Sequence, residues 1–422
     1  MRGILLLSVY MAFLYMGFHT PFILVMGYVW ADIFTPQRIA YSIMPSIPVS
    51  MILGLCVFLS LFRLPKDPDI RLRAATLVTA MFGVWMTITL LWAAVPAAAM
   101  YKWDWAVKAV LFSCLIPFFL RSRMHIEAML WTIVVAGIAH CIPFGVKVLV
   151  SGGGYGKPLG LIMYNAGLGE GSTLAMFAVF LIPMCLYLYK WQTLLPEGKW
   201  VKPMLIFFII MALLTAVGTY ARTGLVCIGV LGMLLILRSR HKVAYLVIVG
   251  VAGFLLSLIT SDEWAGRMGT IGDDTEGSAM ARVAVWFWTL EYVATHPLGG
   301  SFDVYRISQT ALRLSDGSVI METGRAFHSI YFEILGETGI PGMAMYLTIV
   351  LLTRNAFARI ARRKSAPEDA WINDAARYLL FSLYILMAGG AFVAVGFQPY
   401  FYYLAALSVG LININGKLQK AA

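Results

Sequence analysis

Long apolar runs alternate with short polar segments along almost the whole chain, and this alternation sets the predicted architecture. A helix needs about 20 mostly apolar residues to cross the hydrocarbon core of a bilayer. About twelve runs approach that length, roughly 3–30, 43–62, 72–98, 104–120, 126–149, 168–189, 202–219, 223–238, 242–260, 329–354, 372–395 and 398–414. Pro21 is placed to break the long first run, and the short last run suits a tilted or partly re-entrant helix. The pattern predicts an all-α polytopic membrane protein.

The spans divide the chain into three predicted regions. Residues 1–260 form an N-terminal transmembrane bundle of about nine spans, by the length that each crossing needs. Residues 261–328 form a long loop outside the membrane, and residues 329–422 form further transmembrane helices. A loop of this length inside a compact protein is usually functional.

Composition agrees with the membrane assignment. Hydrophobic residues make up 60% of the 422, and charged residues 13%, against about 25% charged in an average soluble domain. A single soluble core, a disordered chain, a collagen and a coiled coil are all excluded by this composition. The net charge of +11 does not indicate nucleic-acid binding, because the basic residues are scattered between apolar runs.

The basic residues are better used to orient the chain. With a cytoplasmic N-terminus, most of the 32 lysines and arginines fall in segments on the inside, as the positive-inside rule requires. This alternation predicts that both termini are cytoplasmic. Each basic residue left on the outside is then more informative, because topology gives it no reason to be there.

The loop at 261–328 is predicted to contain two short helices. Ser278 is placed to cap a helix that runs to about Thr295, and the sequence His-Pro-Leu-Gly-Gly at 296–300 ends it. Trp286 and its aromatic neighbours suit a helix lying at the membrane–water interface. A second short helix is expected at about 304–314.

The first candidate for chemistry is Arg222, where two apolar runs meet with almost no loop between them. A positive charge at a helix end in the membrane boundary is costly unless it is paired or solvated. One interpretation is an arginine that snorkels to lipid phosphate. The other is a fixed anion clamp, because the planar guanidinium binds phosphate oxygens in bidentate fashion.

The second candidate is Arg282, in the first turns of the expected interfacial helix. Ion pairing with Asp274 or Glu276 on a solvated helix face would explain it without any function. Alternatively, Arg282 is a second arm of the same anion site.

The third candidate is His328, where the long loop re-enters the membrane. Histidine exchanges protons near neutral pH, although a lone histidine often has only a structural role. Whether Glu333, five residues further on, can orient the ring is left open. The glycines at 336, 339 and 342 indicate close helix packing. Neither HxxxH nor HExxH occurs, so no metal site and no cofactor are predicted.

Three patterns, in their order along the chain, resemble the O-antigen ligase superfamily of bacterial inner membranes. They are the Arg222 segment, the Arg282-x-x-x-Trp286 helix with its His-Pro-Leu-Gly-Gly end, and the His328-Ser-x-Tyr run with its three glycines. That superfamily includes lipopolysaccharide ligases, O-antigen polymerases and protein O-oligosaccharyltransferases. The stretch from Tyr28 to Arg38 also resembles the branch of ligases found near exosortase systems. Ser329 stands where the family more often has asparagine.

The resemblance implies a GT-C-like fold and glycosyl transfer on the periplasmic side of the inner membrane. The donor would be a glycan on undecaprenyl diphosphate, and the acceptor a sugar hydroxyl of lipid A–core. By position, Arg222 and Arg282 would hold the diphosphate and His328 would act as general base. No nucleotide is implied, and the sequence contains no P-loop.

Second-rank site candidates are Arg325, Lys157, Arg38, Tyr220 and Tyr331. The three basic residues are possible anion contacts, and each is more simply explained as a solvated or interfacial base. Two other functions stay open: a polymerase or protein O-oligosaccharyltransferase with the same donor, and a transporter. A transporter would predict charges in mid-membrane, broken helices and two related halves, and the sequence shows little of these.

Overall fold

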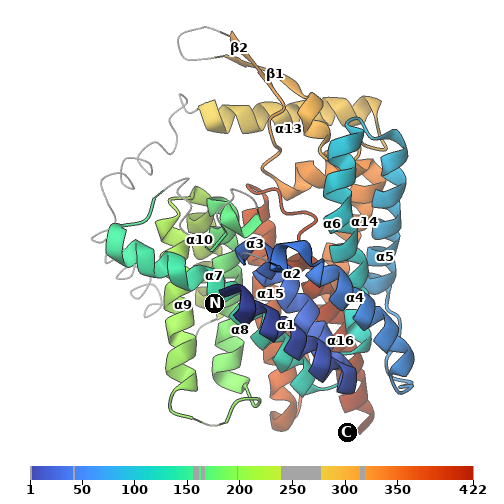
Figure 1. Ribbon diagram of the computed structural model, residues 1–422, viewed down its shortest axis with the longest axis vertical. Coiled ribbons are helices and arrows are strands. Elements are labelled where there is room, and N and C mark those ends of the chain that lie inside the picture. Colours follow the sequence, from blue (N-terminus) through green and yellow to red (C-terminus); the bar gives the residue numbers. More distant parts are fainter. Residues whose placement is uncertain are drawn as a thin grey trace.

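The computed structural model of the protein describes residues 2–40, 43–154, 161–162, 167–196, 198–238, 277–313 and 319–421. Most of its helices run roughly along the long axis of the molecule and form a bundle, and α13 lies across one end of it (Figure 1). Six described helices are long and apolar enough to cross a membrane: Arg2–His19, Ala74–Trp92, Arg123–Ser151, Gly171–Trp191, Val201–Gly218 and Ile330–Arg362. The predicted helical membrane character is confirmed, while the count of twelve spans stays a prediction.

The helices follow the apolar runs, with some changes of boundary. Their bounds are α1 (Arg2–His19), α2 (Pro21–Phe34), α3 (Pro36–Ile39), α4 (Val49–Ser60), α5 (Ala74–Ile88), α6 (Pro96–Ser113), α7 (Arg123–Ser151), α8 (Gly171–Trp191), α9 (Val201–Gly218), α10 (Arg222–Arg238), α13 (Gly277–Thr295), α14 (Ile330–Arg362), α15 (Ala370–Gly390) and α16 (Pro399–Ala421). The helix α6 begins eight residues before the span expected at 104–120, and α16 is a full 23-residue helix. The span expected at 242–260 lies outside the described residues.

The first apolar run is not one span. It breaks at Thr20, and Pro21 starts α2 at a position where a proline costs no helical hydrogen bond. Phe13 packs on Trp30, with ring centroids 5.4 Å apart, and Gly17 lies against Leu24. These pairs show that α1 and α2 are antiparallel. The bounds 3–30 expected for the first span are therefore wrong, because the run forms two helices, of which α1 is the one long enough to cross a membrane. The placement of both termini in the cytoplasm stays a prediction.

The helix α8 forms the centre of the bundle. In its most apolar stretch, 89% of the residues are buried inside the protein, and it packs against α7, α9, α10 and α15. A helix that is apolar on every side is expected in such an interior position. The first turn of α8 is therefore held rigidly at one end of the bundle.

The described part of the long loop begins with the expected interfacial helix. It is α13, and it ends at Thr295 just before His296 and Pro297, as predicted. The second expected helix, at 304–314, is wrong. A short 3-10 turn at Val304–Ile307 leads instead into an antiparallel hairpin of β1 (Gln309–Arg313) and β2 (Val319–Thr323). Figure 1 shows this hairpin beside α13 at the end of the bundle.

The helix α14 is broken near its start. Gly339 has φ +67°, which is outside the helical region, and Pro341 follows it. The backbone of 297–300 packs into this break: Ile340 N–H donates to Pro297 O (2.8 Å), and Gly300 N–H donates to Gly336 O (3.0 Å). The glycines do serve close packing, but their partners differ: Gly339 lies against the loop backbone of 297–299, Gly336 against Phe327, and Gly342 against Trp85.

Candidate active site

Three helix N-termini meet close to the end of the bundle where α13 lies. A Cβ added at Gly171, in the first turn of α8, would lie 3.6 Å from Thr219, just before α10. A Cβ at Gly390, at the end of α15, would lie 2.7 Å from Ile330 in the first turn of α14. Cys227 of α10 contacts Gly389 of the same α15. The segments that carry Arg222 and His328 are therefore neighbours around the start of α8.

The backbone of His328 is held in an unusual conformation. Its φ is +47°, a left-handed value that costs free energy for any residue with a Cβ and therefore needs support from its surroundings. The support comes from α13: Trp286 Nε1 donates to Phe327 O at 2.7 Å, and its ring stacks on Phe332 at 5.0 Å. Ser329 then begins α14, and its carbonyl accepts from Glu333 N–H. The imidazole is thus presented at a fixed angle ahead of the helix.

Burial and nearby charges together favour the neutral form of His328. Burial lowers the pKa of the imidazole most, Arg282 lowers it further, Glu170 acts in the opposite sense, and Arg325 adds a smaller decrease. Arg282 and His328, which are far apart in the sequence, are therefore brought together as the motif order suggested. A neutral imidazole at physiological pH is able to accept a proton.

The turn that carries Arg222 is also tightly fixed. Tyr220 has φ +55°, and its hydroxyl donates to Gly152 O at 2.6 Å. Gly154 N–H donates to Gly218 O at 3.0 Å, so the end of α7 is bound to the end of α9. Arg222 opens α10 and is half-buried. Tyr220 is thereby a positioning residue for the Arg222 turn.

Glu170 is a member of the site that the sequence did not reveal. It precedes α8 and accepts from the backbone N–H groups of Ser172 (3.1 Å) and Thr173 (2.7 Å), which caps the helix. The pattern of an acid two and three residues ahead of serine and threonine is a capping signal. Its second effect, a charge that raises the pKa of His328 against the effects of burial and Arg282, depends on the fold alone.

The structure places the second-rank candidates at different points of the fold. Arg325 is near His328 and pairs with Glu322 at 2.7 Å. Tyr331 donates its hydroxyl to Met387 O at 3.0 Å and ties α14 to α15. Arg38 lies on α3, in the wall of a separate cavity.

Lys157 lies outside the described residues.

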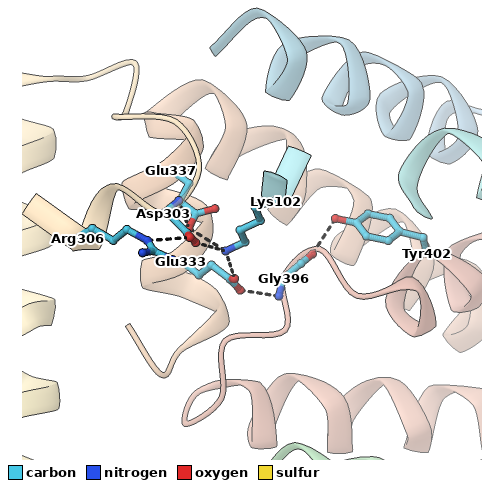
Figure 2. Close-up of polar contacts among 7 residues, drawn as sticks. All are labelled: Lys102, Asp303, Arg306, Glu333, Glu337, Gly396 and Tyr402. Carbon is cyan, nitrogen blue, oxygen red and sulfur yellow. Dashed lines mark hydrogen bonds and ion pairs between the residues drawn. The ribbon is translucent and has the colours of Figure 1, made fainter. Parts of the chain in front are cut away.

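A buried ion cluster joins the start of α14 to α6 (Figure 2). Lys102 Nζ is 2.7 Å from Glu333 Oε1 and 2.8 Å from Glu337 Oε1, both on α14, and 3.8 Å from Asp303 Oδ1. The other oxygen of Glu333 accepts from Gly396 N–H at 2.7 Å. Both oxygens of Glu333 are thus engaged by groups other than His328, so Glu333 belongs to this cluster and does not orient the imidazole. Within the part of the chain that the structure describes, no group of three His, Cys, Asp or Glu is arranged to hold a metal ion.

Two protein-family models match the chain. Residues 206–347 match the family described as O-antigen ligase, and residues 1–193 match a family of unknown function, DUF5935. The first match contains Arg222, Arg282 and His328. No curated protein matches the sequence.

Proposed function

We propose that this protein transfers a glycan from undecaprenyl diphosphate to a sugar hydroxyl of lipid A–core, and the match of residues 206–347 to the family described as O-antigen ligase supports this. The reaction would take place on the periplasmic side of the inner membrane. The observation that carries the proposal is a half-buried His328, fixed in a left-handed conformation next to Arg282 at the meeting point of three helix ends.

In the proposed reaction, His328 accepts the proton of the acceptor hydroxyl as its oxygen attacks the anomeric carbon. The new glycosidic C–O bond forms while the bond from that carbon to the diphosphate breaks. Undecaprenyl diphosphate leaves with the electron pair, and direct displacement inverts the anomeric configuration. A well-placed general base typically raises the rate by a factor of about 10²–10⁴.

Arg222 and Arg282 would stabilise the leaving diphosphate. Negative charge grows on it as the anomeric bond breaks, and fixed guanidinium groups offset that charge without reorganisation. Loss of one such group typically lowers the rate by ~10²–10³. The lowered pKa of His328 fits this arrangement, because burial lowers it most and Arg282, which would bind the diphosphate, lowers it further and so helps to keep the base neutral.

Complementation tests the proposal. Wild-type protein is expected to restore long polymer to the lipopolysaccharide of a ligase-null strain, and His328→Ala to abolish this while membrane levels stay normal. The matched control is His296→Ala, since His296 is an exposed histidine at the far end of α13. Polymer restored by His328→Ala would refute the role of the base. Rescue of a polymerase-null strain alone would assign the polymerase reaction instead.

Arg222 has its own test. Lysine keeps the charge but cannot bind two phosphate oxygens in a planar fork, so Arg222→Lys is expected to fail in the same assay. Near-normal banding would show that Arg222 only snorkels to lipid phosphate.

A further inference from the structure

A cavity of about 540 Å³ lies between the corner of α2 and α3, the start of α4, the middle of α6 and the start of α16. This volume is within the ~300–1,000 Å³ usual for small-ligand sites. Its wall includes Asp32, Thr35 and Gln37 from the N-terminal segment. That segment stands out in the sequence, yet the proposed reaction assigns it no role.

Three polar atoms of the wall are buried and have no hydrogen-bond partner among the described residues: Thr35 Oγ1, Gln37 Oε1 and the hydroxyl of Tyr400. Tyr400 is only 2% exposed. A buried polar group left without a partner destabilises a protein. Thr35 also has φ +49°, a strained value that is found most often at functional positions. Strain and unpartnered atoms at one wall indicate that a ligand completes the hydrogen bonds.

The charges of the wall indicate a neutral ligand. Two carboxylates, Asp32 and Asp104, are matched by two cations, Arg38 and Lys108. Lys108 Nζ is 2.7 Å from Asp104 Oδ1, and Asp32 Oδ2 accepts from Tyr403. A diphosphate site needs an excess of positive charge, which this wall does not have.

Aromatic rings complete the wall. Tyr101, Trp105 and Tyr400 line the cavity together with the amide of Gln398. Such rings have an apolar face and, in tyrosine and tryptophan, a polar edge. A sugar ring offers the complement, with C–H groups on its faces and hydroxyl groups around its rim.

The wall of the cavity reaches the segment just before α8. It includes Gly167 and Leu168, and Glu170 follows two residues later. Glu170 is within electrostatic reach of both His328 and Tyr400. A ligand in the cavity therefore lies near the carboxylate that also acts on His328.

We propose that this cavity is a sugar-binding subsite, and that it holds neutral sugar rings of the acceptor next to the hydroxyl that reacts. The assignment to the acceptor rests on the proposed function, whereas sugar binding itself does not. Tyr400 and Thr35 would donate to or accept from sugar hydroxyls, and Trp105 would pack on a ring face. Arg38 is then a cation balanced by carboxylates, with no diphosphate to bind.

Calorimetry with the full chain in lipid nanodiscs tests the binding step. The probes are core oligosaccharide freed of lipid A, the free O-antigen repeat unit, and undecaprenyl phosphate. Tyr400→Phe and Thr35→Val are each expected to weaken binding of the core oligosaccharide about 2- to 10-fold, the equivalent of one hydrogen bond. Binding of undecaprenyl phosphate is expected to stay unchanged.

Tyr346→Phe is the matched control. Tyr346 is also fully buried and its hydroxyl also lacks a partner among the described residues, but it does not line the cavity. If Tyr400→Phe binds the oligosaccharide as Tyr346→Phe does, or if neither oligosaccharide binds the wild type, the subsite is refuted. Tighter binding of the repeat unit that depends on Tyr400 would overturn the acceptor assignment in favour of the donor glycan.

Kinetics separate this proposal from the proposed function. In a reconstituted transfer assay, Tyr400→Phe is expected to raise the acceptor KM about 2- to 10-fold, with kcat and the donor KM unchanged. A change in the donor KM alone would overturn the acceptor assignment. If no transfer occurs with any acceptor, the proposed function fails, and the calorimetric result decides sugar binding on its own.

Discussion

Replacement of Lys102 by methionine removes the cation of the buried ion cluster while it keeps the length of the side chain. The Nζ group contacts three carboxylates, of Glu333, Glu337 and Asp303, at 2.7, 2.8 and 3.8 Å. Their side chains are 4%, 0% and 14% exposed. Breaking a buried ion pair by removing one partner typically costs about 3–5 kcal/mol. We expect a loss of that size, because Glu333 and Glu337 would then face each other without a cation, while Arg306 remains paired with Asp303 alone.

The assay is equilibrium unfolding in a titration of denaturing detergent, which reports the free energy of unfolding. Lys108→Met is the matched control: it lies on the same helix, but its partner Asp104 is 62% exposed, and such pairs contribute about 0–1 kcal/mol. Adding Glu337→Gln to Lys102→Met is expected to recover part of the loss, since it removes one of the repelling charges. If Lys102→Met and Lys108→Met lose the same free energy, the cluster is not a buried ion network.

Three further predictions concern the site and its support. The acid limb of the kcat/KM profile is expected at a pH below the ordinary histidine pKa of about 6.5. Burial and Arg282 lower the pKa of His328 and so keep the base neutral to lower pH. A pH–rate profile whose acid limb lies at a higher pH contradicts this. Trp286→Phe keeps the stacked ring but loses the 2.7 Å bond to Phe327 O, so kcat should fall about tenfold, as one hydrogen bond allows, with an unchanged melting temperature; a wild-type kcat would show that the bond does not position His328. Gly339 has φ +67°, and Gly339→Ala places a Cβ 2.3 Å from the backbone of Leu298, so this variant should unfold the region or fail to accumulate in membranes. Immunoblotting of membranes measures this, and the control is Gly229→Ala, because Gly229 has open space around it.

The sequence predicted what depends on local pattern. The helix α13 has a run of aromatic residues and a clear stop at His296 and Pro297, so both its existence and its end followed from neighbours in the chain. The hairpin at 309–323 was missed because its strands are only five residues long and derive their stability from each other. A five-residue strand carries too little alternation to separate it from a helical turn.

Lys102 was missed for a different reason. The apolar run around it seemed to start at 104, so the residue was assigned to an outside segment and not to a helix. Its acidic partners on α14 are more than 200 residues further along the chain. Arg222, Arg282 and His328 were singled out by their positions at the ends of apolar runs and helices and then by the order of the motifs, while Glu170, whose charge acts on His328, belongs to none of those motifs.

The break at Gly339 makes two mechanical parts of what looks like one helix. In a continuous helix, inserting one residue turns everything beyond it by about 100°, so a change in span length would rotate the site relative to the bundle. Here the loop that follows α13 binds both sides of the break, through Gly300 to Gly336 and through Pro297 to Ile340. The membrane part of α14 beyond Ile340 is therefore free to lengthen, shorten or tilt over evolution, as bilayers of different thickness demand, while this double attachment keeps the segment after His328 in place.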